Sequence, residues 1–309
     1  MKTKIWAALI AVYIVWGSTY LGISYAVETI PPFLHAGFRF LIAGGILITW
    51  RILAGDQRPT KRQWKSALIV GTLLLVGGNG LIALAEINLP SGIAALIVAT
   101  IPLFMVTLEA IRPGGAKPTK WQLIGLLIGF GGVVFLISPA EIGGPQNLNL
   151  ISCGITLLAA FLWSLGSIYN INADLPESTL LFAGMEMLMG SIGLIIISAI
   201  TGEISHFSFA QVSTTSWLGL IYLICFGSLI GFTSYAFLLR NAPISLISTY
   251  PFVNPVVAIF LGFLFRNEVI TLRTGFAAIT IILSIIMINF FDRRSRQRDQ
   301  KKEQALVVD

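Results

Sequence analysis

The sequence predicts an all-α integral membrane protein with ten transmembrane helices, arranged as two inverted five-helix repeats around a central cavity. Three observations carry this prediction. The composition is too apolar for a soluble protein, the apolar residues form ten segments long enough to cross a membrane, and one helical hairpin occurs twice. Together these observations predict the class of protein, the number of helices and the threading of the two halves.

The composition excludes a soluble globular protein. Apolar residues make up 56% of the 309 residues and charged residues 11%, against roughly 45–50% and 25% in a typical soluble protein. A soluble fold this poor in charge could not cover its surface with polar groups. The two cysteines, Cys153 and Cys225, both lie in apolar segments and indicate no disulfide framework.

Ten segments hold about 20 mostly apolar residues each, the length that crosses roughly 30 Å of hydrocarbon. The first segment follows Lys2 and Lys4 as a signal peptide would, but it is longer than the core of roughly 7–15 residues in such a signal. We therefore expect it to remain as the first helix. The ten segments lie near residues 5–26, 34–54, 65–87, 90–111, 121–138, 150–171, 178–201, 215–238, 243–265 and 271–291.

Basic residues mark one side of the predicted bundle. An even number of spans places both termini on the same side. Of the 20 Lys and Arg residues, 17 then fall on that side, two (Arg266 and Arg273) fall on the other, and Arg39 lies within a span. Because basic loops stay in the cytoplasm, we expect cytoplasmic termini in a plasma membrane, the bacterial inner membrane. The basic tail is then a topology signal attracted by anionic lipid, and no nucleic-acid partner is expected.

One helical hairpin occurs twice. A shift of 153 residues places Asn88 and Pro90 on Asn241 and Pro243, and Pro102 on Pro255, without a gap. Asn tolerates the geometry of a helix end and Pro suits the start of a helix, so each copy is two helices joined by a tight turn. Each half holds five spans, an odd number, so the halves are threaded in opposite senses. The predicted units are residues 1–140, a linker at 141–149, residues 150–292 and a cytoplasmic tail at 293–309.

Several motifs are similar to those of a known family. They are Val15 to Tyr20, Pro31-Pro32 with Arg39, Gly227 to Phe232, Leu238 to Ala242, Val253 to Val257, and Asn267-Glu268. On these motifs the chain resembles the drug/metabolite transporter superfamily, in particular the EamA-type family and its YedA-like members. One departure is Gly115, which stands where a glutamate matching Glu268 would fall. The resemblance implies transport of a small metabolite through a central cavity lined by spans 1, 3, 4, 6, 8 and 9.

Prolines and charges inside the spans are candidate functional features. A proline within a helix removes one N–H and leaves a carbonyl without its partner, which in lipid must be satisfied by protein, water or ligand. We predict a hinge or gate, although such a kink is also tolerated in ordinary membrane helices. The predicted gate residues are Asn88, Pro90, Pro102, Asn241, Pro243, Pro251 and Pro255. Arg39 either snorkels to the outer surface or faces the interior, and Glu186, its counterpart under a shift of 147 residues, is deeper.

Polar and aromatic residues at mid-span depth are candidates for the cavity wall. The alternatives are interface anchors for the aromatic residues and helix–helix contacts for the Asn residues. The candidates are Trp16, Tyr20, Asn79, Thr100, Trp163, Tyr169, Tyr235, Tyr250 and Asn254. Glu86 and Glu109 end their spans and are interpreted as boundary residues that reach water. Arg39 and Glu186, near opposite surfaces, are not expected to pair.

The predicted function is secondary transport, with export expected, of a small organic metabolite such as an amino acid or a related compound. No metal, cofactor or catalytic cluster is expected, because no Walker motif, paired carboxylates or Cys-x-x-Cys appears. Two alternatives remain: a membrane-embedded enzyme acting on lipid, and a helical scaffold without a cavity. The expected partners are the substrate and the lipid bilayer. Gly125 and Gly129 predict close helix packing, including a possible homodimer contact.

Overall fold

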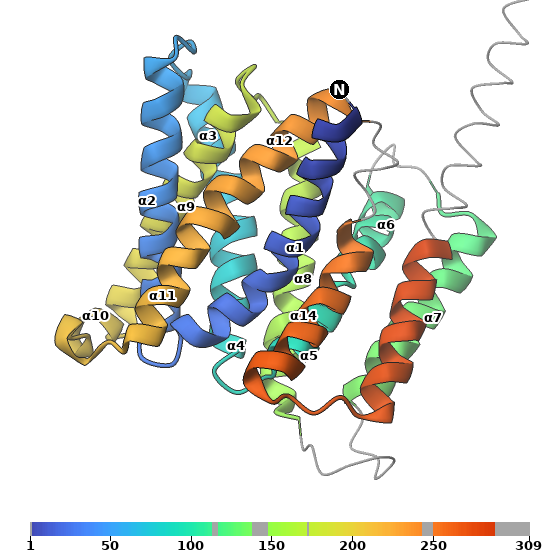
Figure 1. The fold of residues 1–309 in the computed structure, drawn as a ribbon. Coiled ribbons are helices and arrows are strands. Elements are labelled where there is room, and N and C mark those ends of the chain that lie inside the picture. Colours follow the sequence, from blue (N-terminus) through green and yellow to red (C-terminus); the bar gives the residue numbers. More distant parts are fainter. Residues whose placement is uncertain (1, 113–116, 138–147, 172, 243–249, 288–309) are drawn as a thin grey trace, which may run out of the picture.

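The computed structural model describes residues 2–112, 117–137, 148–171, 173–242 and 250–287, and all regular elements in these ranges are helices (Figure 1). The all-α prediction is therefore confirmed for the described part of the chain. Most of the predicted linker, the basic tail at 293–309 and the gate residue Pro243 lie outside the described residues.

The helices follow the predicted spans. The first half runs through α1 (Lys2–Ala26), α2 (Pro32–Leu53), α3 (Lys61–Gly71), η1 (Thr72–Gly80), α4 (Leu81–Ala85), α5 (Ser91–Val98), α6 (Ile101–Ile111) and α7 (Lys120–Ile137). The second half runs through α8 (Leu150–Ile171), α9 (Thr179–Ile200), α10 (Glu203–His206), η2 (Phe209–Gln211), α11 (Thr214–Tyr222), η3 (Leu223–Ile230), α12 (Gly231–Asn241), α14 (Tyr250–Arg266) and a helix at Leu272–Met287.

Among the described residues, seven helical stretches are long and apolar enough to cross a membrane. Three of them are composite, because α3–η1–α4, α5–α6 and α11–η3–α12 each form one stretch. Shorter apolar helices cover the other predicted spans, at Lys120–Leu136, Val253–Arg266 and Leu272–Met287. The chain is thus a multi-pass membrane protein, while the arrangement of ten spans as an inverted repeat stays a prediction.

Polar residues set the starts of several helices, where backbone N–H groups lack partners within the helix. The Thr60 hydroxyl accepts from the Gln63 N–H at 3.3 Å, and the Gln63 side chain accepts from the Thr60 N–H at 2.9 Å, forming a capping box before α3. Ser178 caps α9 through its hydroxyl. Glu203 of α10 accepts from the Leu34 N–H at 2.9 Å and so caps α2 from another part of the chain.

Two π-helical segments occupy matching places in the two halves. η1 and η3 are the π-helices of the third and eighth predicted spans. The shift of 153 residues places η1 on residues 225–233, which overlap η3 at 223–230. The sequence does not predict either segment, because a π-helix leaves no recognisable period in a uniformly apolar run. Such segments are frequent at functional sites.

Glycines bring α2 and α9 into close antiparallel contact. A Cβ added at Gly44 would lie 2.9 Å from the carbonyl oxygen of Gly184, and one added at Gly37 would lie 2.9 Å from Ile195. Residue numbers rise along α2 as they fall along α9, so the two helices run in opposite directions. Small residues permit this approach in a membrane, where helices associate through packing.

The predicted glycine contact on α7 is made within the chain. A Cβ added at Gly129 would lie 2.6 Å from both the Leu103 side chain and the Ser284 hydroxyl. A Cβ added at Gly132 would lie 3.1 Å from Ile281 and 3.2 Å from Thr280, both on the helix Leu272–Met287. Close helix packing is therefore present, but Gly129 and Gly132 pack against helices of the same chain. These two glycines give no support to a homodimer, which stays a prediction.

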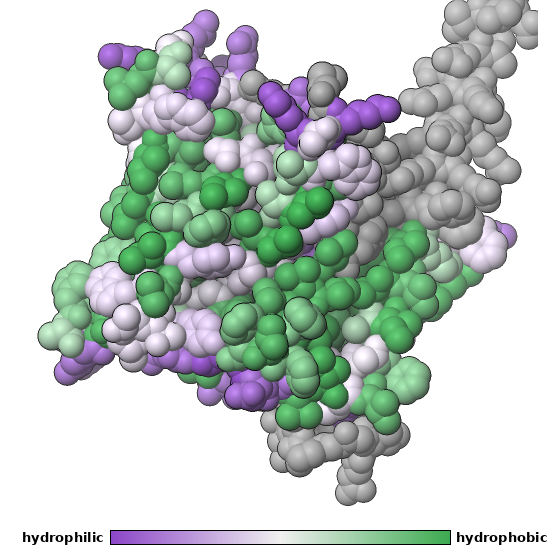
Figure 2. Space-filling model, in the orientation of Figure 1, coloured by the Kyte–Doolittle hydropathy of each residue, from purple (hydrophilic) through white to green (hydrophobic). Residues whose placement is uncertain are grey.

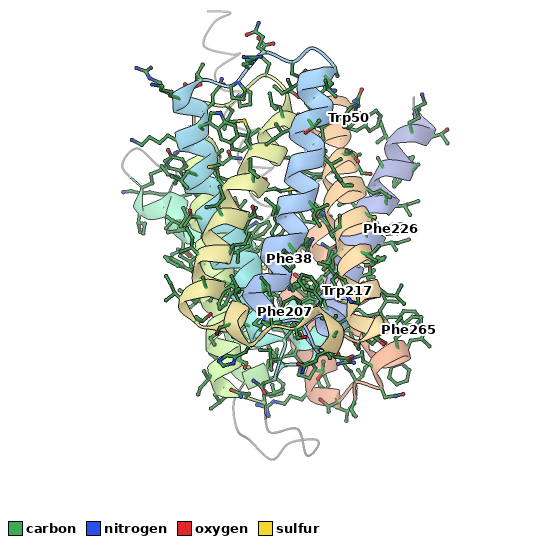
Figure 3. All side chains as sticks on the ribbon, turned by 90° about the vertical axis from the view of Figure 1, so that its left-hand side faces the viewer. Phe38, Trp50, Phe207, Trp217, Phe226 and Phe265 are labelled. Atoms are coloured by element: carbon green, nitrogen blue, oxygen red, sulfur yellow. The ribbon has the colours of Figure 1, made fainter. Side chains whose placement is uncertain are left out.

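Apolar side chains cover the outside of the bundle. Trp6, Ile14, Leu127 and Phe260 are each more than half exposed, and Figure 2 shows hydrophobic residues across the middle of this face with hydrophilic residues at its two ends. Aromatic residues lie toward both ends: Figure 3 shows Trp50 near one end, and Phe207, Trp217 and Phe265 toward the other. This distribution is typical of a surface that faces lipid between two aqueous interfaces.

Candidate functional site

A central cavity of about 130 Å³ lies between helices of both halves. Its walls come from α1, α2, η1, α4, α5 and α6 of the first half and from α8, α12 and α14 of the second. These include all six spans implied by the family resemblance and add the second span through α2. The cavity brings together six predicted candidates, namely Trp16, Tyr20, Asn79, Trp163, Tyr250 and Asn254, with the predicted gate residues Pro102 and Pro255. Their role as substrate contacts stays a prediction.

Three predicted candidates lie outside the walls of this cavity. The Thr100 side chain is fully buried and its hydroxyl donates to the Ile97 carbonyl at 2.6 Å. Tyr235 stands behind the wall, with its ring 5.1 Å from that of Trp16. Tyr169 is 38% exposed and, together with Lys65, lines a separate cleft. The prediction that Tyr169 lines the central cavity is therefore wrong. It lies near the end of α8, beyond the depth of the cavity.

Aromatic rings form one wall of the cavity. Trp16 is central: its ring centroid lies 5.5 Å from that of Phe232 and 5.1 Å from that of Tyr250, and its indole N–H donates to the Gly227 carbonyl at 3.2 Å. These contacts join α1 to η3, α12 and α14. Phe232 and Thr19 also line the cavity and were not predicted, although both lie within motifs that carry the family resemblance.

Arg39 of α2 points into the protein and lines the cavity. The residue is 4% exposed, and its Nε donates to the Ser228 hydroxyl of η3 at 2.9 Å. Its guanidinium carbon lies 4.7 Å from the centre of the Phe40 ring. The snorkelling alternative is therefore wrong, because the guanidinium finds its polar partner inside the bundle and not at the outer surface.

Glu186 of α9 is also buried, at 6% exposed. As expected, it forms no ion pair with Arg39, and the ion pairs within the described residues all involve other groups. Glu186 does not line the cavity. The two intramembrane ionisable residues thus occupy different surroundings, and of the two only Arg39 lines the cavity.

The predicted gate residues Pro102 and Pro255 lie in different helical surroundings. α5 ends at Val98 and α6 begins at Ile101, so the fourth span is interrupted directly before Pro102. Pro255 lies inside α14, which continues from Tyr250 to Arg266. A proline inside a continuous helix is also tolerated in ordinary membrane helices, so a hinge role at Pro255 stays a prediction.

The predicted gate residues at the tight turns lie at helix ends. Pro90 directly precedes α5, and the N–H of Asn88 donates to the Ala85 carbonyl at 3.1 Å. Asn241 ends α12, where its side-chain amide donates to the Phe237 carbonyl at 2.8 Å. The carbonyl that a break at Pro251 would free belongs to residue 247, outside the described residues. A hinge or gate role for these residues stays a prediction.

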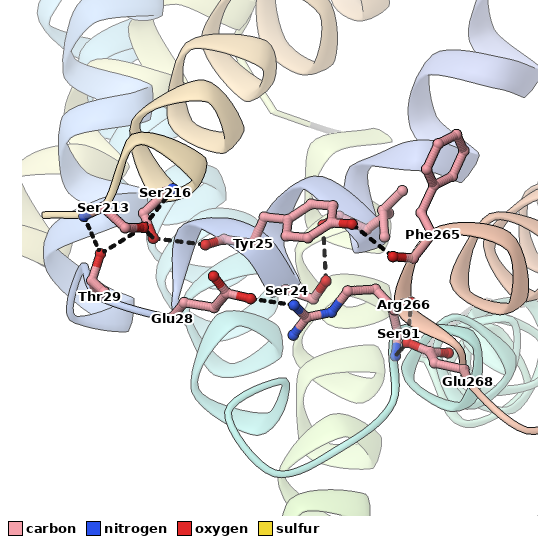
Figure 4. Close-up of polar contacts among 11 residues, drawn as sticks. Ser24, Tyr25, Glu28, Thr29, Ser91, Ser213, Ser216, Phe265, Arg266 and Glu268 are labelled. Carbon is pink, nitrogen blue, oxygen red and sulfur yellow. Dashed lines mark hydrogen bonds and ion pairs between the residues drawn. The ribbon is translucent and has the colours of Figure 1, made fainter.

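Polar contacts tie several helices together at the predicted outer end of the bundle (Figure 4). The Glu268 carboxylate accepts from the Ser91 N–H at 2.8 Å, the Ser91 hydroxyl at 2.7 Å and the Gly92 N–H at 3.0 Å. Arg266 pairs with Glu28, and the Tyr25 hydroxyl donates to the Phe265 carbonyl at 2.9 Å. We call this group, Tyr25, Glu28, Ser91, Phe265, Arg266 and Glu268, the outer cap. Sequence reasoning missed it because its contacts span 176 to 240 residues.

Glu86 lies behind the outer cap, one residue beyond the span Lys61–Ala85. It is 6% exposed, and neither carboxylate oxygen has a hydrogen-bond partner in the described structure. Burial, followed by the charge of Glu268, raises the pKa of Glu86 well above its ordinary value, while Arg266 acts in the opposite direction. The interpretation of Glu86 as a boundary residue in water is therefore wrong.

Comparison with known proteins agrees with this architecture. The model of the EamA-like transporter family matches residues 3–138 and again residues 150–290. The chain is 38% identical to the uncharacterized inner membrane transporter YedA of Escherichia coli K12, covering 92% of this chain and 90% of that protein. It is 27% identical to the uncharacterized transporter YvbV of Bacillus subtilis, covering 93% and 92%.

The fold is also similar to that of a solved crystal structure of a protein 19% identical to this chain, with a TM-score of 0.62 over 94% of this chain and 98% of the other. That likeness concerns the fold alone. The family match covers almost all of the chain in two copies, and the relatives are named as transporters and not as enzymes. The protein belongs to the EamA-like transporter family of the drug/metabolite transporter superfamily.

Proposed function

We propose that the protein is a secondary transporter, working as an exporter, that moves a small organic metabolite such as an amino acid by alternating access. The observation that carries this proposal is the central cavity, whose wall is built from both halves of the chain. A buried water molecule needs roughly 10–15 Å³ of such cavity volume. The cavity of about 130 Å³ therefore has room for on the order of ten water molecules. A molecule of amino-acid size fits that space.

An inverted repeat underlies the proposed mechanism, and helix contacts support it. α1 packs on α14 while α8 packs on α5 and α6, and α2 packs on α11 and η3 while α9 packs on α3 and η1. Each contact thus has a counterpart in which the two halves exchange roles. The antiparallel course of α2 and α9, the second helices of the two halves, agrees with a two-fold axis in the membrane plane.

The proposed orientation places both termini in the cytoplasm and the outer cap on the opposite side. Reporter fusions after residues 144 and 309 test it. An alkaline phosphatase fusion should be active at 144 and inactive at 309, and a green fluorescent protein fusion should give the reverse pattern. A cytoplasmic signal at 144 would reject both the orientation and the inverted repeat.

Transport itself is tested with purified protein in lipid vesicles. A panel of small metabolites is loaded inside or outside, and flux is compared with protein-free vesicles. Two variants on the same helix provide a matched pair: Trp163→Ala alters the cavity wall, and Tyr169→Ala alters the separate cleft. We expect Trp163→Ala to lower flux at least about tenfold, and Tyr169→Ala to leave it near that of the parent.

The outcomes separate the proposal from its alternatives. Flux of at least one compound that depends on Trp163 supports transport. If no compound of the panel moves, or if both variants behave like the parent, the cavity is not a transport site. A scaffold without a cavity is disfavoured by the cavity itself, and a lipid-acting enzyme is disfavoured by the names of the relatives.

A further inference from the structure

The cavity wall carries a single charged side chain among the described residues, and that charge is positive. Arg39 has five N–H donors, of which the one on Nε meets the Ser228 hydroxyl. No carboxylate pairs with Arg39 in the described structure, where the ion pairs lie elsewhere. Burying a cation without a partner costs several kcal/mol as a rough order of magnitude. An acceptor supplied from outside the chain would offset that cost.

The surroundings of Arg39 hold the guanidinium in place. Its Nε is fixed by Ser228, its planar group lies over the Phe40 ring, and a Cβ at Gly227 would come within 3.0 Å of Nη2. The neighbouring Thr19 hydroxyl already donates to the Trp16 carbonyl at 2.6 Å. Because Arg39 lines the cavity, its remaining donors are placed for a ligand there, and a planar carboxylate matches that donor geometry.

Asn254 supplies a second group without a partner. Its side-chain oxygen is buried and accepts no hydrogen bond in the described structure, although the residue lines the same cavity. Arg39 comes from α2 in the first half, and Asn254 comes from α14 in the second. The cavity therefore presents a cationic donor and a neutral acceptor from opposite halves, together with aromatic rings in the same wall.

We propose that this cavity binds a small organic carboxylate, held by Arg39 through its acid group and by the aromatic wall of Trp16, Tyr20 and Trp163 through its apolar part. Asn254 accepts a hydrogen bond from an amino or hydroxyl group of the same molecule. Cations lacking an acid group find no carboxylate in the wall to pair with. This inference rests on the proposed transport function and names the substrate class of that site.

A matched series of four ligands of similar size tests the proposal: L-leucine, 4-methylpentanoate, L-leucinamide and 3-methylbutylamine. The first two carry a carboxylate and the last two do not. Binding to the purified full-length protein is followed by tryptophan fluorescence, because Trp16 and Trp163 line the cavity. We expect both carboxylates to bind, L-leucine more tightly because its ammonium reaches Asn254, and the amide and amine to bind at least about tenfold more weakly.

Variants assign the effect to Arg39. Arg39→Gln should weaken carboxylate binding at least about tenfold, whereas Arg39→Lys, which keeps the charge, should lose less. Glu186→Gln is the matched control, since it replaces a buried carboxyl group outside the cavity wall and should leave binding unchanged. Thermal unfolding of each variant checks that the fold is retained, and the ligand series on the parent decides the question if Arg39→Gln does not fold.

Three results would overturn the proposal: equal binding of acids and amides by the parent, unchanged carboxylate binding by Arg39→Gln, or no binding of either carboxylate at millimolar concentration. Flux assays in vesicles separate this failure from failure of the transport function. Arg39-dependent binding without flux leaves the site standing and rejects transport. Flux of an amine or neutral compound that ignores Arg39→Gln leaves transport standing and rejects the carboxylate site.

Discussion

The Glu268→Ala variant tests the outer cap most directly. In this variant the backbone N–H groups of Ser91 and Gly92 and the Ser91 hydroxyl lose their acceptor. Ser91 is fully buried, so water does not readily replace the carboxylate. Each buried donor left unsatisfied costs about 1–3 kcal/mol, and a carboxylate at a helix N-terminus contributes about 0.3–1 kcal/mol. With partial relaxation, we expect the free energy of unfolding to fall by about 2–4 kcal/mol.

Glu28→Ala is the matched control. It removes another acid of the outer cap, but Glu28 and its partner Arg266 have side chains 35% and 32% exposed. Exposed ion pairs contribute about 0–1 kcal/mol, so the control should cost less than about 1 kcal/mol. Denaturant unfolding in detergent compares the two variants with the parent. Equal losses in both variants would refute the assignment of the Glu268 contacts as the principal restraint.

The same variant reports on access to the cavity. If outward opening breaks the Glu268 contacts, a loss of about 2–4 kcal/mol in the closed state raises the ratio of open to closed molecules about 30- to 700-fold. The readout is labelling of an Asn79→Cys variant by a membrane-impermeant thiol reagent from the outer side, with Cys153 and Cys225 replaced. Glu268→Ala should accelerate labelling, and Glu28→Ala should change it little. Identical labelling rates would show that the outer cap does not restrain opening.

Three further tests address the structure elsewhere. Glu86→Gln removes a buried acid whose pKa is raised in the folded state, so the folded state holds its proton to higher pH than the unfolded state. The parent should therefore lose stability as the pH rises from about 4.5 toward the raised pKa, and the variant should not. A stability difference between parent and variant that stays constant from about pH 5 to pH 7 would contradict this. Gly71→Ala should destabilise the fold strongly, because the new Cβ would lie 2.4 Å from the Glu186 carbonyl oxygen. In the control Gly45→Ala the new Cβ meets nothing within 4 Å, so this variant should be neutral or stabilising. Similar stability changes in the two variants would contradict the close approach of η1 and α3 to α9 at Gly71. Pro255→Ala restores a hydrogen bond inside α14 and should raise stability by up to about 3 kcal/mol, more than Pro102→Ala at the start of α6. Both proline variants should lower transport, and normal transport by both would remove the hinge role.

The spans could be predicted from the sequence because lipid imposes one strong condition, a long apolar helix with its backbone groups satisfied internally. α8 begins and ends where the apolar segment 150–171 does. The π-helices could not be predicted, because the choice between α and π geometry depends on neighbours. η3 is one example: its Gly227 carbonyl and Ser228 hydroxyl meet Trp16 and Arg39 about 190 to 210 residues away in the sequence.

The side chains of the cavity were only partly predictable, for a related reason. In a soluble helix the polar face indicates which side meets water, but between Ala36 and Leu47 Arg39 is the one polar residue of α2. Successive residues of a helix point about 100° apart, so a small rotation of α2 about its axis would turn Arg39 from the cavity toward the lipid. Only the packing of α2 against its neighbours sets that rotation. Tyr169 illustrates the complementary error: it lies on the same helix as Trp163, yet six residues farther along it meets the separate cleft.

On α2, close packing and the polar contact of Arg39 involve different partner helices. The close contact of α2 with α9 is made by glycines and aliphatic side chains, as expected where lipid provides no hydrophobic drive for helix association. Arg39 projects from the same helix α2, but its polar partner, Ser228, lies on η3. A rearrangement that moves η3 and α14 against α2 could therefore reshape the cavity while the α2–α9 contact stays intact. Such a movement would stretch or break the hydrogen bond from Arg39 to Ser228, because Arg39 belongs to α2 and Ser228 to η3.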